Sequence, residues 1–173
     1  MRISGVIAAA LALVCAFQPA VAQDAVTARN AAFIRQCLGL LTRSTVDKYM
    51  TCWADEVGNN GRPVSRDRLR DTVNDIVNTF PDFKFTILAI VAENEVVVAR
   101  VTQSGTHRGV AKTNFNGGGL TGIEPTGKQM EILATHWFTV RNGKIIEQQA
   151  VRDDLTMMRQ LGLAPPAVAP PRP

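Results

Sequence analysis

The side chain best suited to acid–base chemistry is His136, which lies in a segment of alternating apolar and polar residues. Burial on an apolar face would lower the imidazole pKa and keep the ring neutral near pH 7, able to donate or accept a hydrogen bond. Two interpretations stay open, namely a core histidine with satisfied hydrogen bonds and a histidine that faces a pocket. The apolar residues on the same face of the predicted strand are Met130, Ile132, Ala134, Phe138 and Val140.

Asp153 is the candidate general base. A carboxyl group at the rim of an apolar cavity has a raised pKa and can accept a proton from a substrate. The competing interpretation is that Asp153 or Asp154 only caps the helix that follows.

Arg100 and His107 are candidate polar contacts for a ligand. Arg100 alternates with two valines, so it is either a buried cation that needs Asp153 or an anionic substrate as its partner, or a surface residue. His107 lies between glycines that allow a bend, where its ring either binds the backbone or contacts the ligand.

The elements that must position these residues are helical in the first half of the chain. Apolar residues recur at helical spacing over 24–41, 45–53 and 65–80, and Ser65 is the predicted N-cap of the third helix. The sequence Gly58-Asn59-Asn60-Gly61 predicts a turn between the second and third helices.

The hydrophobic period changes to two after residue 82, which indicates strands. The tight turn at Asn142-Gly143 joins the last two strands, and a short helix over 154–160 closes the fold. Helices followed by a run of antiparallel strands predict an α+β fold. The predicted strands cover residues 83–91, with alternate side chains on one face, and residues 96–103, 107–115, 129–140 and 145–152.

An ordered series of short motifs resembles the SnoaL-like (polyketide or ester cyclase) branch of the NTF2-like superfamily. The resemblance covers residues 31–163 and implies a curved, mostly antiparallel sheet that N-terminal helices wrap around one apolar pocket. The motifs are Phe80-Pro81-Asp82, Gly105-Thr106-His107-Arg108-Gly109, Thr126-Gly127-Lys128, Asn142-Gly143-Lys144-Ile145, Asp153 and Gln160-Leu161-Gly162.

The resemblance also implies site residues. SnoaL-like cyclases carry a pocket histidine seven residues before the hairpin glycine, which is His136 here, and Asp153 matches a further family carboxylate. Their acid–base carboxylate, seven residues after that glycine, is replaced by Ala150, and the tryptophan often found before it is replaced by Gln149. Residues expected to contact a ligand are Tyr49, Trp53, Phe80, Arg100, His107, Phe138 and Gln149.

Two hypotheses therefore remain. The first is an enzyme without a cofactor that performs acid–base chemistry on a small, largely apolar carbonyl compound, with Asp153 as the base and His136 as the group that positions the carbonyl. The second is a binding or assembly protein that keeps the pocket but lacks catalysis, which Ala150 favours. A homodimer is expected by analogy with NTF2-like proteins.

The first 22 residues have the features of a signal peptide, with one positive charge, an apolar run over 6–16 and the small-x-small sequence Ala20-Val21-Ala22. The run is too short to span a membrane, so a secreted, periplasmic protein is predicted. Removing 22 of 173 residues leaves 151, predicted to form one domain over 23–163 and a proline-rich, disordered tail over 164–173.

Composition limits the classes of partner and of site. The mature chain carries 18 basic and 15 acidic residues without a basic stripe, which argues against binding to nucleic acid. Two histidines are too few for a typical metal site, so no metal is expected. Cys37 and Cys52 are predicted to form a disulfide in an oxidising compartment.

Overall fold

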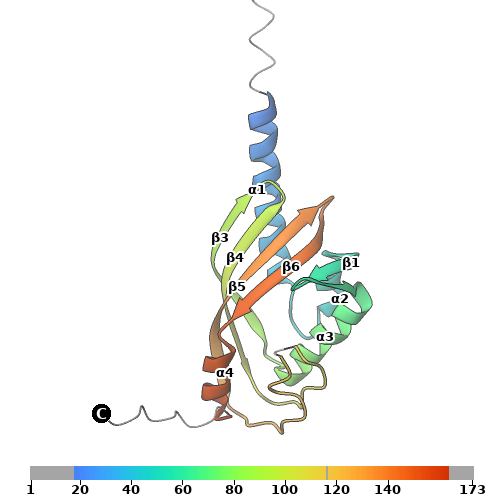
Figure 1. Cartoon of the computed structure of the whole chain (residues 1–173). Coiled ribbons are helices and arrows are strands. Elements are labelled where there is room, and N and C mark those ends of the chain that lie inside the picture. Colours follow the sequence, from blue (N-terminus) through green and yellow to red (C-terminus); the bar gives the residue numbers. More distant parts are fainter. Residues whose placement is uncertain (1–17, 116, 164–173) are drawn as a thin grey trace, which may run out of the picture.

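The computed structural model describes residues 18–115 and 117–163. The tail over 164–173 and most of the predicted leader therefore lie outside the described residues. The leader residues 18–22 form the start of helix α1 (Gln18–Gly39), whose first turns project beyond the body of the protein in Figure 1. No helix within the described ranges combines the length and apolar character needed to cross a membrane.

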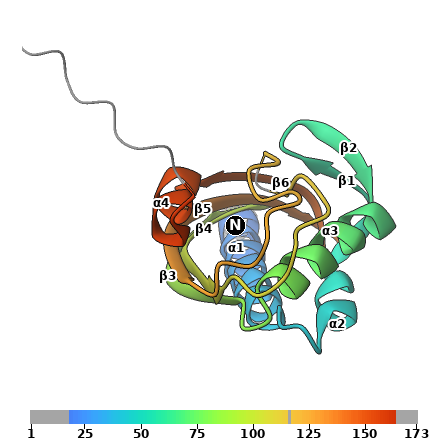
Figure 2. The same ribbon diagram turned by 90° about the horizontal axis from the view of Figure 1, so that it is seen from below.

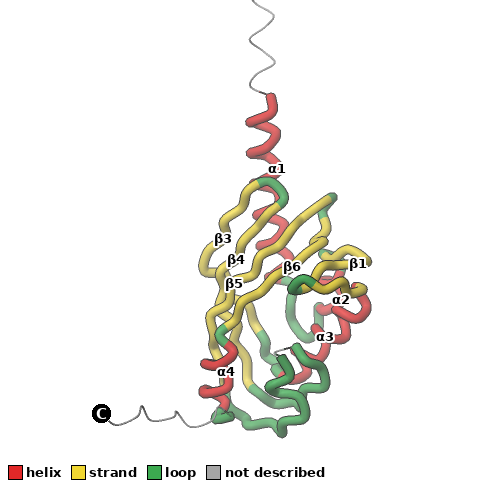
Figure 3. Tube along the Cα trace, viewed as in Figure 1, coloured by secondary structure: helices red, strands yellow, loops and turns green. Residues whose placement is uncertain are grey.

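Six strands form one curved sheet, which confirms the predicted α+β architecture (Figures 1 and 3). The strands are β1 (Trp53–Asn59), β2 (Arg62–Ser65), β3 (Lys84–Glu93), β4 (Val96–Thr106), β5 (Gln129–Arg141) and β6 (Lys144–Arg152). Their order across the sheet is β2-β1-β6-β5-β4-β3. All neighbouring pairs are antiparallel except β1 and β6, which run parallel although about 90 residues separate them in the chain.

Three further helices accompany the sheet, namely α2 (Val46–Met50), α3 (Arg66–Thr79) and α4 (Asp154–Leu161). The long helix α1 packs against β3 and β4. Two of its polar side chains fix it to the turn between these strands, because Asn94 donates from its backbone nitrogen to Thr27 Oγ1 (2.9 Å) and accepts from Asn30 Nδ2 (2.8 Å).

Helix α3 begins at the predicted cap, where Ser65 Oγ accepts a hydrogen bond from the backbone nitrogen of Arg68. Leu69, Val73 and Val77 recur every four residues and are buried against the concave side of the fold. The helix ends at Thr79, two residues before Pro81, as the sequence predicts.

The sequence-based prediction of a helix through Trp53 is wrong. Helix α2 stops at Met50 and strand β1 starts at Trp53, which is fully buried against the sheet. The turn cluster then forms a β-hairpin, with Asn60 and Gly61 both at positive φ. Strands of seven and four residues contain too few alternating apolar positions to be recognised by periodicity alone.

The prediction that side chains alternate strictly between the two faces along the first long strand is also wrong. The pairing of β3 with β4 shifts between Ile87 and Ala89, so Leu88 is an extra residue in a β-bulge. Phe85 and Ile87 face inward before the bulge, but Val91 is 70% exposed after it. A bulge moves every later side chain to the opposite face, and nothing in the spacing of the apolar residues indicates it.

The inner faces of β4 and β5 agree with the prediction. All six side chains expected on one face of β5, from Met130 to Val140, are buried. The turn to β6 places Asn142 (φ 51°) and Gly143 (φ 68°) in the left-handed region, as a two-residue hairpin of this kind requires.

Residues 107–128 form a loop that crosses below the open side of the sheet (Figure 2). The predicted strand over 107–115 is wrong, because the chain crosses the end of α3 there. The backbone nitrogens of Arg108 and Gly109 donate to Thr79 O, and a Cβ atom on Gly109 would lie only 2.3 Å from Asn78 O. A single bridge, between Ala111 and Thr121, is the only strand-like pairing described within the loop.

Asp75 and Asp82 hold this loop and its start in place. Asp75, a buried residue of α3, accepts hydrogen bonds on Oδ2 from the backbone nitrogens of Lys112 (2.8 Å) and Thr113 (2.6 Å). Asp82 accepts from both the backbone nitrogen and the hydroxyl of Thr106, which lowers its pKa. The loop is therefore fixed by carboxylates rather than by strand pairing.

The predicted disulfide is present between Cys37 at the end of α1 and Cys52 just before β1. Both cysteines are buried in the core. The bond therefore ties the first helix to the start of the short hairpin that forms one edge of the sheet.

Candidate functional site

The concave side of the sheet encloses a cavity of about 1110 Å³. Its walls come from α2, α3, the β1–β2 hairpin, the inner faces of β3 to β6 and the loop that crosses the opening. Exposed residues of its wall, among them Arg62, Arg68 and Lys112, form the mouth of the cavity. Its apolar wall includes Tyr49, Trp53, Phe80, Phe83, Phe85 and Ile132.

His136 lies in this wall and is 5% exposed. Its Nε2 atom lies 2.8 Å from the side-chain nitrogen of Gln103, whereas its Nδ1 atom is buried and has no hydrogen-bond partner among the described residues. Burial, together with the positive charge of Arg152, lowers the imidazole pKa to about 4. The ring is therefore neutral at physiological pH and has one nitrogen available to a ligand.

Aromatic rings hold this imidazole in a fixed orientation. Phe85 meets it edge to face at 5.5 Å between ring centroids, and Phe138 stacks on it at 5.8 Å. Phe138 is fully buried and supports His136 and Trp53 from behind rather than lining the cavity. The expectation that Phe138 contacts a ligand directly is therefore corrected to a packing role.

Tyr49, Trp53 and Phe80 lie in the cavity wall, where the sequence analysis placed them. Tyr49 packs edge to face on Trp53 at 5.8 Å, and burial raises the pKa of its hydroxyl well above the usual range. The Tyr49 hydroxyl is therefore neutral and can donate a hydrogen bond.

The two family positions on β6 point in opposite directions. Ala150 pairs with His136 across the strands and lines the cavity, so a methyl group stands beside the imidazole. Gln149 is exposed on the outer face, where it pairs with Trp137 and donates to Glu147. The expected contact between Gln149 and a ligand is corrected, because neighbouring residues of a strand alternate between faces.

Asp153 does not have the environment expected of a general base. It is exposed, lies outside the cavity wall and caps α4, where its Oδ1 accepts from the backbone nitrogen of Thr156 at 3.0 Å. These hydrogen bonds lower its pKa, whereas the base hypothesis required a raised pKa. The structure therefore agrees with the competing interpretation, in which Asp153 caps the helix that follows it.

The next residue, Asp154, does line the cavity. Its Oδ2 accepts from Arg152 at 3.1 Å, and its Oδ1 is buried without a hydrogen-bond partner among the described residues. Arg152 also donates to the carbonyl oxygen of Phe115 at 2.7 Å. This contact joins β6 to the crossing loop.

Arg100 and His107 lie away from the cavity. Arg100 is exposed on the outer face of β4, which resolves the two alternatives in favour of a surface residue. His107 is fully buried at the start of the crossing loop, where its Nδ1 accepts from the backbone nitrogen of Thr126 at 3.2 Å. Phe80 packs on its ring at 5.7 Å, so its role is to hold the loop.

Sequence reasoning missed Gln103 and Asp154. Gln103 is a buried polar residue on a face of β4 that is otherwise occupied by Val97, Ala99 and Val101. A polar residue in that alternation was a usable signal. Asp154 gave none, because a helix start contains two adjacent aspartates and only the structure distinguishes the capping residue from its neighbour.

The described part of the chain contains no group of three or more histidine, cysteine, aspartate or glutamate residues arranged to hold a metal ion. The polar side chains of the cavity wall include Gln103, Tyr49, Arg152 and Asp154, and Gln103 contacts His136.

A family model described as SnoaL-like polyketide cyclase matches residues 29–161. No match was found among curated protein sequences. Solved structures of similar fold include AclR, a candidate hydroxylase from Streptomyces galilaeus, with 21% identity, a TM-score of 0.67 and coverage of 83% of this chain and 86% of AclR.

Two further solved structures are SnoaL-like polyketide cyclases. The candidate cyclase from Jannaschia sp. CCS1 is 16% identical, with a TM-score of 0.66 and coverage of 82% of this chain and 96% of its own. The protein from Agrobacterium tumefaciens is 23% identical, with a TM-score of 0.61 and coverage of 75% and 95%. At these identities the similarity establishes the fold.

Proposed function

The chain belongs to the SnoaL-like polyketide cyclase family, and from that premise we propose that it is an exported enzyme that moves a proton on a small carbonyl compound bound in the cavity. The observation that carries the proposal is the environment of His136. This imidazole lies in an aromatic wall and is held at one nitrogen by Gln103, and its other nitrogen has no partner in the part of the chain that the structure describes.

In the proposed reaction, the carbonyl oxygen of the substrate accepts a hydrogen bond from the neutral imidazole of His136. An Asp154 oxygen removes a proton from the carbon next to that carbonyl, so the C–H electron pair becomes part of an enolate. The hydrogen bond from His136 stabilises the negative charge that develops on the oxygen. The proton returns from Asp154 to product or solvent, and no oxidant or reductant is needed.

Asp154 replaces Asp153 in this scheme because Asp154 lines the cavity and Asp153 does not. Ala150 cannot transfer a proton, so the scheme uses a carboxylate from the start of α4 instead of one from the middle of β6. Tyr49 is a second neutral donor in the same wall and can position the carbonyl.

The test is exchange of the acidic C–H of a β-ketoester for deuterium, followed by NMR, since it detects proton transfer without requiring ring closure. We expect exchange above the buffer rate, reduced about 100-fold or more in Asp154→Asn and unchanged in Asp153→Asn. Exchange that is equal in the wild-type protein and in Asp154→Asn would reject the catalytic assignment.

The second candidate function is a binding protein without catalysis, and Ala150 favours it. A methyl group stands opposite His136, where the resembled cyclases have their proton-transferring carboxylate. Saturable binding of the same β-ketoester, without exchange in any variant, would support this function. In Ala150→Asp, a gain of exchange would show that the scaffold lacks only that group.

Export and dimerisation are part of the proposal. The apolar leader sequence and the Cys37–Cys52 disulfide support an oxidising compartment such as the periplasm. Trp137 and Val151 support a sheet-to-sheet homodimer, because they lie close together on the outer face of β5 and β6 and are 51% and 78% exposed.

A further inference from the structure

We infer that the mouth of the cavity binds an anionic group, so that the ligand carries a carboxylate or similar anion at one end and an apolar body at the other. This inference rests on the proposed function, because it requires a small molecule in the cavity. It adds the charge of that molecule and the residues that bind the charged group.

The charged residues of the cavity wall are mostly basic. Arg62 comes from β2, Arg68 from α3, Lys112 from the crossing loop and Arg152 from β6. The two acidic residues of the wall are Asp71 and Asp154. Counted over the described residues, the wall therefore carries four positive and two negative charges.

Ion pairing inside the wall leaves most of this positive charge free. Arg152 and Asp154 contact each other and offset one another. Within the described residues, Arg62, Arg68 and Lys112 form no ion pair. Three free cations thus stand against one remaining carboxylate, and they come from three separate parts of the cavity wall.

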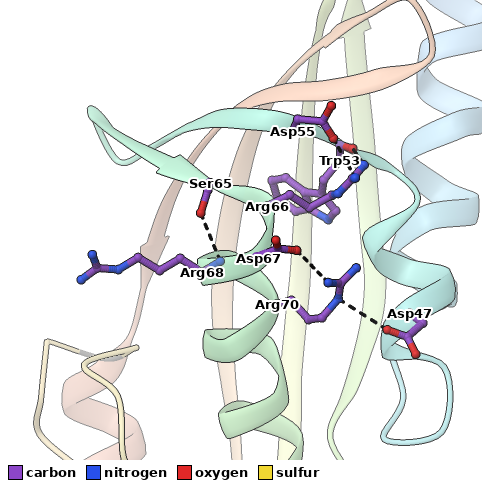
Figure 4. Close-up of polar contacts among 8 residues, drawn as sticks. All are labelled: Asp47, Trp53, Asp55, Ser65, Arg66, Asp67, Arg68 and Arg70. Atoms are coloured by element: carbon purple, nitrogen blue, oxygen red, sulfur yellow. Dashed lines mark hydrogen bonds and ion pairs between the residues drawn. The ribbon is translucent and has the colours of Figure 1, made fainter.

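Arg68 differs from the other arginines of its helix (Figure 4). Arg66 pairs with Asp55 at 2.7 Å, and Arg70 pairs with Asp67 at 2.8 Å. The side chain of Arg68 extends away from these pairs and makes no contact with an acid in the same view. Among Arg66, Arg68 and Arg70 on α3, Arg68 is therefore the arginine that lines the cavity and the one without an acidic partner in the described residues.

Arg62, Arg68 and Lys112 are exposed to solvent, so they attract an anion toward the cavity by a field that salt screens. The planar guanidinium of Arg68 can also form two parallel hydrogen bonds with one carboxylate. The same wall is aromatic where Phe80 and Phe83 are buried and Phe85 is partly buried. The arrangement therefore fits an amphipathic acid that enters with its apolar end first.

The experiment compares three ligands that share one aromatic body and differ in charge: 4-(2-naphthyl)butanoate, its primary amide and 4-(2-naphthyl)butylamine. Affinities for the mature protein are measured by titration calorimetry at pH 7.5 in low and high salt. We expect the acid to bind about tenfold more tightly than the amide and the amine to bind most weakly. The preference should shrink in high salt because the cations are near solvent.

Matched variants locate the effect. Replacing Arg68 and Lys112 by glutamine should remove most of the preference for the acid and change the affinity for the amide less than about twofold. Arg35→Gln combined with Arg43→Gln removes the same two charges at exposed positions outside the cavity wall and should change neither affinity. Circular dichroism and thermal melts confirm that each variant is folded.

The outcomes separate the two proposals. Equal binding of acid and amide to the wild-type protein would overturn the inference but leave a ligand-binding cavity. Binding of none of the three ligands would count against the proposed function itself. A preference for the acid that persists in the double glutamine variant would show that other residues read the charge, and would also overturn the inference.

Discussion

Gln103 and His136 meet through a side-chain contact of 2.8 Å, although they are not opposite one another in the sheet. Gln103 on β4 pairs with Ile132, and His136 on β5 pairs with Ala99. The two pairs are four residues apart on each strand. The contact therefore crosses the concave face diagonally, and both side chains must point toward the same interior space. This relationship makes the state of His136 dependent on a residue of the neighbouring strand.

Gln103→Glu should raise the pKa of His136. A carboxylate beside Nε2 favours the imidazolium form, which opposes the effect of burial. The pKa should move upward from about 4 and be measurable by NMR titration of the imidazole carbons. Gln103→Leu is the control, because it removes the contact without adding charge. An unchanged pKa in the glutamate variant would show that the two side chains do not interact in solution.

His136 should make the protein less stable in mild acid. Its pKa is about 4 in the folded state and about 6.5 in an unfolded chain, so the unfolded state binds the proton first as pH falls. The contribution of neutral His136 to the free energy of unfolding is fully present above pH 6.5. This contribution falls by roughly 3 kcal/mol as the pH decreases to 4. Urea unfolding at pH 7 and pH 4.5 measures this loss.

His136→Asn should remove most of that pH dependence, since asparagine does not titrate. A smaller dependence of the same sign should remain, because burial also lowers the pKa of His107. If the variant loses as much stability in acid as the wild-type protein, the buried, neutral state assigned to His136 is wrong.

Asp153→Ala and Asp154→Ala should separate stability from function. Loss of the Asp153 cap should lower the melting temperature slightly and leave the exchange of β-ketoester protons intact. Loss of Asp154 should abolish exchange with little change in melting temperature. The reverse pattern would return the role of base to Asp153.

The disulfide should contribute about 3 kcal/mol to the free energy of unfolding, as expected for a loop of 15 residues. Cys37→Ser combined with Cys52→Ser removes it, and urea unfolding of the two proteins measures the difference. Titration of the unfolded wild-type protein should find neither thiol reactive unless reductant is added. Two reactive thiols in mature protein purified without reductant would contradict the bond.

Trp137→Arg should convert the proposed dimer into a monomer, because it places a charge in the centre of the exposed apolar area on β5 and β6. Sedimentation of the wild-type and variant proteins measures the change. Leu88→Arg, at an exposed apolar position on β3, is the matched control. A wild-type protein that is monomeric at all concentrations would reject the dimer.

Periodicity predicted the long elements because their burial is regular. The inner face of β5 and the stripe of α3 follow spacings of two and about four residues without interruption. The bulge at Leu88 and the short β1–β2 hairpin broke that regularity, so β3 after residue 87 and the region around Trp53 were assigned wrongly.

The site was predicted only as far as strand alternation and the resemblance reach. Alternation and the resemblance predicted that His136, Tyr49, Trp53 and Phe80 face one pocket. These four residues do line one cavity. Neighbouring residues of a strand face opposite sides, so an inward Ala150 implies an outward Gln149. The predicted ligand contact of Gln149 rested on the family motif alone and did not use this alternation. The contact between Gln103 and His136 depends on the curvature of the sheet, which the sequence does not specify.

The parallel pairing of β1 with β6 has a consequence for how the protein acquires its final shape. The edge hairpin has no neighbour until the last strand is available, and Ile145 then donates to Cys52 O at 2.8 Å. Contacts between such distant segments slow folding. The covalent link at Cys52 shortens the search, because it can close early between nearby segments and hold the hairpin ready for the arriving strand. Oxidation before collapse would therefore speed maturation of the pocket.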